Sequence, residues 1–275
     1  MKINYYYEMG KPVIEENGVK YDYFNPMNDI VFKSILRNDR NHIIIKILVF
    51  ELLGIEIENF LEKDNGFSAK GTNMKGECCD YKVSINGKAI SIECNKKKSA
   101  KLIERNISHL RRMIIDDGFD VVQINIDGYD IERKGCLFYE YEMKGKNGEE
   151  FYKDLIKIIH INITKIEEKL YNKEELTELE KVCSLFLIRD RGLLGKIVKG
   201  DEGLMELKGI IENITNDNDL YQEYSKSELY AMEERREGKE EEKIEIAKKL
   251  LNNNVDISII SSSTGLKKED IINLK

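Results

Sequence analysis

The stretch "DYKVSINGKAISIECN", residues 80–95, constrains the fold more than any other part of the chain. An Asn-Gly pair between two alternating runs is the strongest short-range signal for a two-residue hairpin turn, because both turn residues must adopt positive φ. The pair here is Asn86-Gly87, and such a turn sets the register of the two strands. Counting outward from the turn places Asp80 directly opposite Glu93.

The two strands of this hairpin present alternate side chains to opposite faces of a sheet. One face is apolar and comprises Tyr81, Val83, Ile85, Ile90 and Ile92. The other face is polar and comprises Asp80, Lys82, Ser84, Ser91, Glu93 and Asn95. We therefore expect the apolar face to pack into the core and the polar face to be available for chemistry.

The opposed carboxylates of Asp80 and Glu93 require a compensating charge, because like charges opposite each other on a sheet repel, with side chains roughly 5 Å apart. A lysine could supply that charge in a surface ion pair, either Lys82 or one of the lysines at 96–98. A hard divalent cation could also supply it, since such ions are held by one or two carboxylates plus substrate phosphates. The hairpin geometry leaves both alternatives open.

The distribution of charge along the chain is uneven. The formal net charge is -7 with a pI near 5.4, which argues against a protein that coats nucleic acid with its whole surface. Residues 70–112, however, hold eleven basic and four acidic side chains, a local excess of +7 that leaves -14 for the remainder. Such a basic island suits phosphate binding, which supplies most nucleic-acid affinity. A solvated helix face beside a lysine-rich loop is the alternative.

The cysteines and the apolar segments indicate the compartment. Five cysteines without a CxxC pair, together with three scattered histidines, match no zinc spacing. The odd cysteine count and the lack of an apolar region in "MKINYYYEMG" predict reduced thiols and no signal peptide. The most apolar run, "IIIKILVFELLG", is interrupted by Lys46 and Glu51. We expect a soluble cytoplasmic protein that makes no membrane contact.

The chain divides by pattern into four predicted parts. Residues 1–24 lack clear periodicity and are expected to form an N-terminal arm, 25–165 an α/β domain built around the hairpin, 166–227 a helical extension, and 228–275 a charged helix with a helix-turn-helix-like tail. The tail has a short apolar helix, a Thr264-Gly265 turn and a second short helix. Contact of this tail with DNA and a helical hairpin without a DNA role are both open.

Within the second part, Asn25 is expected to cap a helix that has Pro26 at its first position. A second helix is predicted at 42–53, and a weak extended stretch near 67–72. A further helix begins after Ser99 and ends at Gly118. Its predicted inward stripe is Leu102, Ile103, Ile107, Leu110 and Ile114, opposite Lys101, Arg105, Ser108 and Arg112. Strands are expected in "DVVQINID", "CLFYEYEM" and "KIIHINIT".

These segments resemble the PD-(D/E)XK nuclease family, and more narrowly its recombination-promoting nuclease or transposase group. The resemblance covers most of the chain and rests on "NDIVFKSIL", "ILVFELLG", "CDYKVSINGKAISIECN", "IERNISHLRRMI", "VVQINIDGYD", "IKIIHINI" and "STGLKKEDI". It implies an α/β fold with an αβββαβ core, in which a mixed central sheet is flanked by helices, followed by an α-helical C-terminal extension. It also implies a DNA endonuclease that uses Mg²⁺, with Mn²⁺ as a substitute.

The resemblance assigns roles to particular residues. Asp80 and Glu93 would hold the metal, and Asn95 stands where the superfamily has Lys and this group often has Gln. An asparagine amide can position a water molecule but carries no charge, so the change puts catalysis in doubt. Lys96, Lys97, Lys98 and Arg105 would hold DNA phosphates. Glu51 is a loosely aligned candidate for a further acid, and we favour the account in which it is a solvent-facing Glu on an amphipathic helix.

Three functions follow from this reading. The first is hydrolysis of phosphodiester bonds in DNA by the acids and their metal ion. The second is a catalytically impaired DNA-binding or regulatory protein that keeps the nuclease fold, because Asn95 is uncharged. The third is an interaction module in which the charged C-terminal helix mediates self-association, for which a homodimer is the simplest form.

Overall fold

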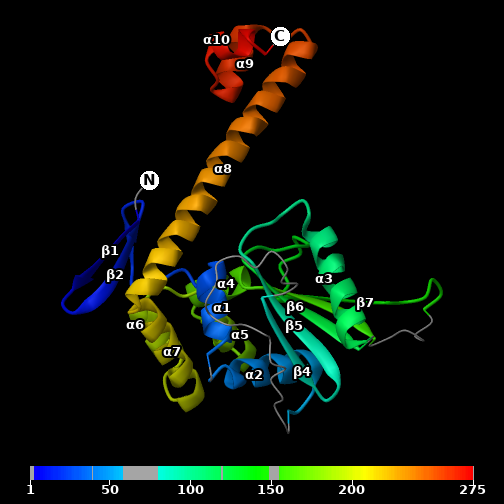
Figure 1. Cartoon of the computed structure of the whole chain (residues 1–275), viewed down its shortest axis with the longest axis vertical. Coiled ribbons are helices and arrows are strands. Elements are labelled where there is room, and N and C mark those ends of the chain that lie inside the picture. The colour runs from blue at the N-terminus through cyan, green and yellow to red at the C-terminus, as the bar shows by residue number, and fades with distance from the viewer. Residues whose placement is uncertain (1–2, 39, 58–79, 119, 149–154, 275) are drawn as a thin grey trace. The chain divides into compact units, whose positions relative to one another are not determined.

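The computed structural model describes residues 3–38, 40–57, 80–118, 120–148 and 155–274 (Figure 1). The chain divides into two compact units, residues 2–224 and residues 225–275. The finer boundaries expected at residues 24 and 165 stay predictions. Among the helices of the described ranges, we find none with the length and apolar character that crossing a bilayer requires.

The first residues form a small antiparallel sheet instead of the expected arm. It has the order β1 (Ile3–Glu8), β2 (Lys11–Glu16) and β3 (Val19–Tyr21). The turn between β2 and β3 is Asn17-Gly18, with φ of 53° and 81°. This is the same Asn-Gly signal that marks the central hairpin, so the strands were readable from their turn although their side chains lack a clear alternation.

A five-stranded mixed sheet forms the centre of the larger unit. Its strands, in spatial order, are β4 (Tyr81–Ile85), β5 (Lys88–Asn95), β6 (Val121–Asp127), β8 (Ile156–Asn162) and β7 (Phe138–Glu142). β5, β6 and β8 run parallel, whereas β4 and β7 are antiparallel to their neighbours.

The hairpin register and all three strands expected after it are confirmed. Tyr81 pairs with Ile92, and Asn86 and Gly87 form the turn with φ of 50° and 80°. The mixed α/β architecture with a helical C-terminal part is therefore as expected. The stretch near 67–72 lies outside the described residues, so an αβββαβ core remains a prediction.

Seven helices of the described residues surround the two sheets. They are α1 (Asp29–Leu36), α2 (His42–Leu53), α3 (Leu102–Asp117), α4 (Thr164–Asn172), α5 (Glu178–Ser184), α6 (Arg191–Ile197) and α7 (Glu202–Thr215). In Figure 1, α3 lies on one side of the central sheet and α1, α2, α4 and α5 lie on the other. The predicted bounds of α2 are confirmed, with Gly54 in the left-handed conformation after its last turn.

The cap expected for α1 is wrong. Asn28, and not Asn25, caps the helix, since its Oδ1 accepts a hydrogen bond from the backbone N–H of Ile30 at 3.1 Å. Asn25 uses its side chain in a turn one step earlier, where its Oδ1 accepts from the backbone N–H of Met27 at 3.0 Å. Each of the two asparagines can accept a hydrogen bond from a backbone N–H two residues later. The backbone path after Pro26 decides which of them becomes the N-cap.

The expected inward stripe of α3 is also wrong at two positions. Ile103 is 71% exposed and Ile107 is 58% exposed, whereas Asn106 is buried. The C-terminal half of the helix packs on apolar sheet residues through Leu110 and Met113. The N-terminal half lies over a polar part of the sheet, so the helix turns polar side chains inward there. Apolar periodicity identifies the buried face only when the partner surface is apolar.

The smaller unit has the expected shape of a long helix followed by two short ones. α8 (Asn218–Asn252) starts about ten residues earlier than expected and is followed by α9 (Ile257–Thr264) and α10 (Lys268–Ile272). Gly265 adopts φ of 73° between the short helices. Their apolar side chains close a small core of Ala247, Ile260, Leu266 and Ile271. The helix-turn-helix shape is confirmed, and its contact with DNA stays a prediction.

Candidate functional site

The face of the central sheet under α3 changes from apolar to polar along the strands. Because β5, β6 and β8 are parallel and in register, alternate residues form rows across the three strands. From the amino to the carboxyl end the rows are Ala89, Val121 and Ile156; Ser91, Gln123 and Ile158; Glu93, Asn125 and His160; and Asn95, Asp127 and Asn162. Polar side chains therefore gather at the carboxyl ends of parallel strands, where open α/β sheets bind ligands.

This polar layer is buried, which corrects the expectation of an open face. Glu93 and Asn95 are each 3% exposed, and Asn125 and Asp127 are completely buried. α3 covers the layer and contributes the side chains of Asn106 and His109 to it. Buried polar groups are normally hydrogen-bonded, so the partners within the layer decide its chemistry.

Asp80 lies beside the end of β5, as the hairpin register requires. Its Oδ2 accepts a hydrogen bond from the backbone N–H of Cys94 at 2.9 Å. Its Oδ1 lies 3.3 Å from the Nζ of Lys33, which also pairs with Asp29 at 2.7 Å. Burial raises the pKa of the Asp80 carboxyl, and the charge of Lys33 opposes that rise. A lysine therefore compensates one of the two acids.

The compensating lysine differs from those expected. Lys33 belongs to α1, more than forty residues before the hairpin in the chain. Lys82 pairs with Asp117 at the end of α3, with 2.7 Å between Nζ and Oδ2. The packing of α1 beside the sheet brings Lys33 to Asp80. The register of the hairpin alone could not predict this ion pair.

Glu93 is the less satisfied of the two acids. Its Oε1 is buried and makes no hydrogen bond to the described residues, although the Nδ1 of His109 lies 3.4 Å from this same oxygen as an ion-pair contact. Burial raises the pKa of the Glu93 carboxyl, the nearby charge of Asp80 adds to the rise, and His109 opposes it. A buried carboxylate oxygen without a donor is costly and is suited to a cation.

Asn95 has all its polar groups engaged inside the layer. Its Nδ2 donates to the Oδ1 of Asp127 at 2.7 Å and to the Oδ1 of Asn125 at 3.1 Å. Its Oδ1 accepts a short hydrogen bond from the guanidinium of Arg105 on α3. The charge of Arg105 also opposes the burial-driven rise in the pKa of Glu93 and of Asp127. A positive charge therefore lies next to the uncharged Asn95.

Asp127 and His160 form a buried pair that the sequence analysis left without a role. The Oδ2 of Asp127 lies 2.7 Å from the Nδ1 of His160. The Nε2 of His160 in turn lies 3.4 Å from the Nδ2 of Asn106, so the ring connects Asp127 on the sheet to Asn106 on α3. Burial raises the pKa of Asp127, and its bonds with His160 and Asn95 oppose this rise. The alternating polar residues of "VVQINID" were the signal for this pair.

The remaining candidates do not join the buried layer. Lys96 is half-buried just past the end of β5, and Lys97 and Lys98 are exposed on the following bend. Glu51 is exposed near the end of α2. The lysines are therefore placed to meet a ligand outside the sheet edge, and Glu51 is placed on the surface.

The fit of a metal ion depends on these contacts. Within the described part of the chain, no three or more side chains of His, Cys, Asp or Glu lie together in a way that could hold a metal ion. The pair of Asp80 and Glu93, with one orphaned oxygen, matches what Mg²⁺ needs from a protein, because that ion keeps several waters and takes further oxygens from substrate phosphates. The residues present thus fit a two-carboxylate site.

Comparison of the chain with family models, with curated proteins and with solved structures finds no match.

Proposed function

We propose that this protein is a metal-dependent DNA endonuclease of the PD-(D/E)XK recombination-promoting type, which hydrolyses phosphodiester bonds. The observation that carries the proposal is the proximity of two carboxylates, the half-buried Asp80 and the buried Glu93, beside the end of β5, where the Glu93 Oε1 makes no hydrogen bond. Two neighbouring acids in a largely buried place repel each other, and a bound cation would offset that repulsion.

In this proposal Asp80 and Glu93 hold Mg²⁺ or Mn²⁺. A metal ion bound there would supply a water of lowered pKa and a positive charge beside the phosphate. Arg105 supplies the positive charge that Asn95 lacks, since its guanidinium donates directly to the Asn95 amide oxygen. Asn95 then acts as the anchor that orients Arg105, while Lys96, Lys97 and Lys98 contact flanking phosphates.

The direct test is incubation of the purified protein with supercoiled plasmid in Mg²⁺, in Mn²⁺ and in EDTA. We expect nicking or linearisation that requires metal, and a loss of about 100-fold or more in Asp80→Asn and in Glu93→Gln. Asp116→Asn and Glu104→Gln are matched controls, because these acids are exposed on α3. Cleavage that survives both active-site substitutions would disprove the assignment.

A second candidate is DNA binding without cleavage, and one observation favours it. Lys33 already neutralises Asp80 at 3.3 Å, so the acid pair is partly compensated from within the protein. In that case a gel shift would show DNA binding through the basic loop, the plasmid would stay intact under every metal, and Mg²⁺ would leave the thermal stability unchanged. Metal-dependent stabilisation that disappears in Glu93→Gln would exclude this candidate without reference to cleavage.

A further inference from the structure

A groove of about 600 Å³ opens where the three parallel strands end. Each strand contributes to it by the residues that follow its last position. Lys96 follows β5, Gly128 follows β6, and Ile163 and Thr164 follow β8. The groove therefore begins one residue beyond Asn95 and Asp127, which close the polar layer.

Close contact between two strand ends shapes this rim of the groove. The backbone N–H of Gly128 donates to the carbonyl oxygen of Asn95 at 3.0 Å. A Cβ at position 128 would lie 2.8 Å from the carbonyl oxygen of Lys96, so only glycine allows this approach. The two loops are thus held together, and Lys96 is kept at the groove edge.

The opposite wall is largely apolar. It is formed by Met27 before α1, by Phe186, Leu187 and Ile188 between α5 and α6, and by Leu193 in the first turn of α6. Met27 also links the wall to the acid site, since its carbonyl oxygen lies 3.5 Å from the Sγ of Cys94. Contact between a flat apolar ring and this wall would remove apolar surface of both from water, which favours binding.

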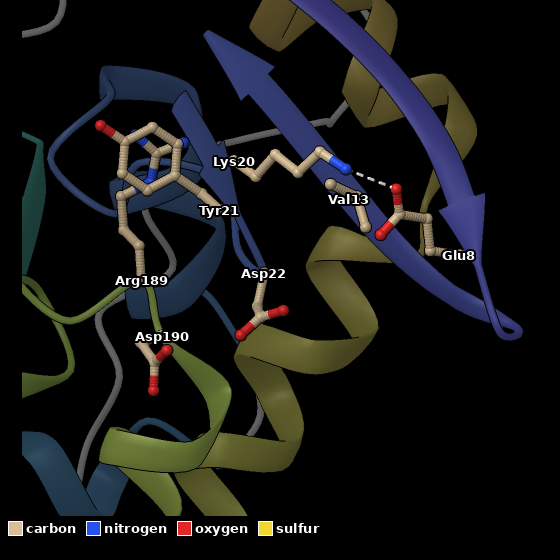
Figure 2. A pocket seen from close by; sticks show the side chains of 7 residues that line it. All are labelled: Glu8, Val13, Lys20, Tyr21, Asp22, Arg189 and Asp190. Atoms are coloured by element: carbon tan, nitrogen blue, oxygen red, sulfur yellow. Dashed lines mark hydrogen bonds and ion pairs between the residues drawn. The ribbon is translucent and has the colours of Figure 1, made fainter. Parts of the chain in front are cut away.

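A stacked pair stands at the end of the groove. The Arg189 guanidinium lies 3.6 Å from the centre of the Tyr21 ring. Glu16 holds Arg189 with two hydrogen bonds of 2.9 and 2.7 Å, and the carbonyl oxygen of Tyr23 accepts a third at 3.0 Å. Figure 2 shows Tyr21 and Arg189 among the side chains that line a smaller hollow of about 260 Å³, together with Lys20 and Asp190. The stack therefore contributes a planar surface to both hollows.

The groove edge carries charges that suit an anion. Lys96 lines it, as does Lys20, whose Nζ is paired with Glu8 at 2.6 Å, and Thr164 is the first residue of α4, whose N-cap position lacks a side-chain cap. Burial alone would raise the pKa of Glu16, but hydrogen bonds from Arg189 and Tyr224 and the charge of Lys96 hold it below its usual value. Two acids also line the groove: Asp190, which caps α6, and Glu167 in the first turn of α4.

The groove is close enough to the acid pair for both to contact one DNA strand. Lys96 lies three residues beyond Glu93 along β5 and its extension, which corresponds to about 10 Å at the strand rise. An apolar wall, a planar cationic stack and a lysine edge are the features that bind unpaired nucleotides, by stacking on the base and pairing with its phosphate.

We propose that this groove holds one unpaired nucleotide of the DNA strand whose neighbouring phosphodiester lies at the acids, with the base against the Tyr21–Arg189 stack and the phosphate at Lys96. The inference rests on the proposed nuclease function and narrows its substrate to DNA with a single-stranded part. Fully paired DNA places its bases inside the helix and offers none to the stack.

The test measures binding of the full-length protein to labelled DNA by fluorescence anisotropy in EDTA, so that cleavage plays no part. A short duplex with a single-stranded overhang is compared with the blunt duplex. We expect the overhang to bind about 10-fold more tightly, and Tyr21→Leu to remove most of that difference, whereas Tyr21→Phe keeps it. Lys96→Gln should lower the slope of log affinity against log salt by about one for the overhang duplex. Lys199→Gln is the matched surface control and should change neither quantity.

The outcomes separate this inference from the nuclease proposal. Equal affinity for both duplexes, or an overhang preference that survives Tyr21→Leu in a protein with wild-type circular dichroism, would overturn the groove assignment even if the plasmid is cleaved. A Tyr21-dependent preference in a protein that cleaves nothing would keep the groove and remove the nuclease. Displacement of the overhang probe by an equimolar free nucleotide would also overturn the assignment, because a strand site needs the neighbouring phosphates.

Discussion

Replacing Asp127 by alanine tests the buried polar layer most directly. Its two carboxylate oxygens are the acceptors for the Nδ2 of Asn95 and the Nδ1 of His160, each at 2.7 Å, and the residue is completely buried. Asp127→Ala leaves the Nδ1–H of His160 and one N–H of the Asn95 amide in the interior without this acceptor, while the other N–H of Asn95 keeps Asn125. The substitution therefore changes the partners of the layer and leaves the apolar core intact.

The expected loss of stability follows from the number of donors left unpaired. Each buried polar group without a partner costs about 1 to 3 kcal/mol, so the two donors together cost about 2 to 6 kcal/mol. Burial raises the pKa of Asp127, and removing its charge relieves that penalty. We therefore expect a net loss of about 2 to 4 kcal/mol, the lower part of the range.

Urea unfolding followed by circular dichroism measures this loss. With a slope of about 2 kcal/mol per molar urea, the midpoint should fall by about 1 to 2 M. Asp116→Ala is the control, because Asp116 is exposed and pairs with Arg112 in the preceding turn of α3. If the urea midpoint of Asp127→Ala equals that of the control, the expected loss is refuted. The buried N–H groups of Asn95 and His160 would then not need the Asp127 carboxylate as an acceptor.

Three further predictions concern the packing and the thiols. Ile107→Lys should leave the free energy of unfolding in urea within about 0.5 kcal/mol of wild type, whereas Leu110→Ala should lower it by about 2 to 5 kcal/mol. Equal losses of stability in the two variants would contradict the orientation of α3. Gly128→Ala should lower the melting temperature, measured by calorimetry, because its Cβ would meet a backbone carbonyl oxygen at 2.8 Å, and an unchanged melting temperature would argue against this contact. Burial raises the pKa of Cys183 to about 12, so iodoacetamide mapping by mass spectrometry at pH 8 should label exposed Cys136 and not Cys183, and labelling of Cys183 in folded protein would contradict its burial.

Local signals predicted the parts of this fold that depend on near neighbours. The turn at Asn86-Gly87 needs only its own two residues, and its register follows from counting outward, which is why Asp80 and Glu93 could be placed together. The same reasoning applied to Asn17-Gly18 would have identified the first sheet. Helix ends were less predictable, as Asn28 shows, because several polar residues compete for one cap.

The sequence by itself determined the hairpin, the order of the later strands and the opposition of the two acids, since each depends on residues within one or two turns or strands. Only the tertiary structure decided that Lys33 neutralises Asp80, that Arg105 meets Asn95, and that Asp127 and His160 pair beneath α3. Lys33 and Asp80, for example, are 47 positions apart in the sequence, and the packing of α1 on the sheet brings them together. Which side chains are buried between a helix and a sheet depends on the polarity of both contacting faces. The residue pattern of the helix alone describes only one of these two faces.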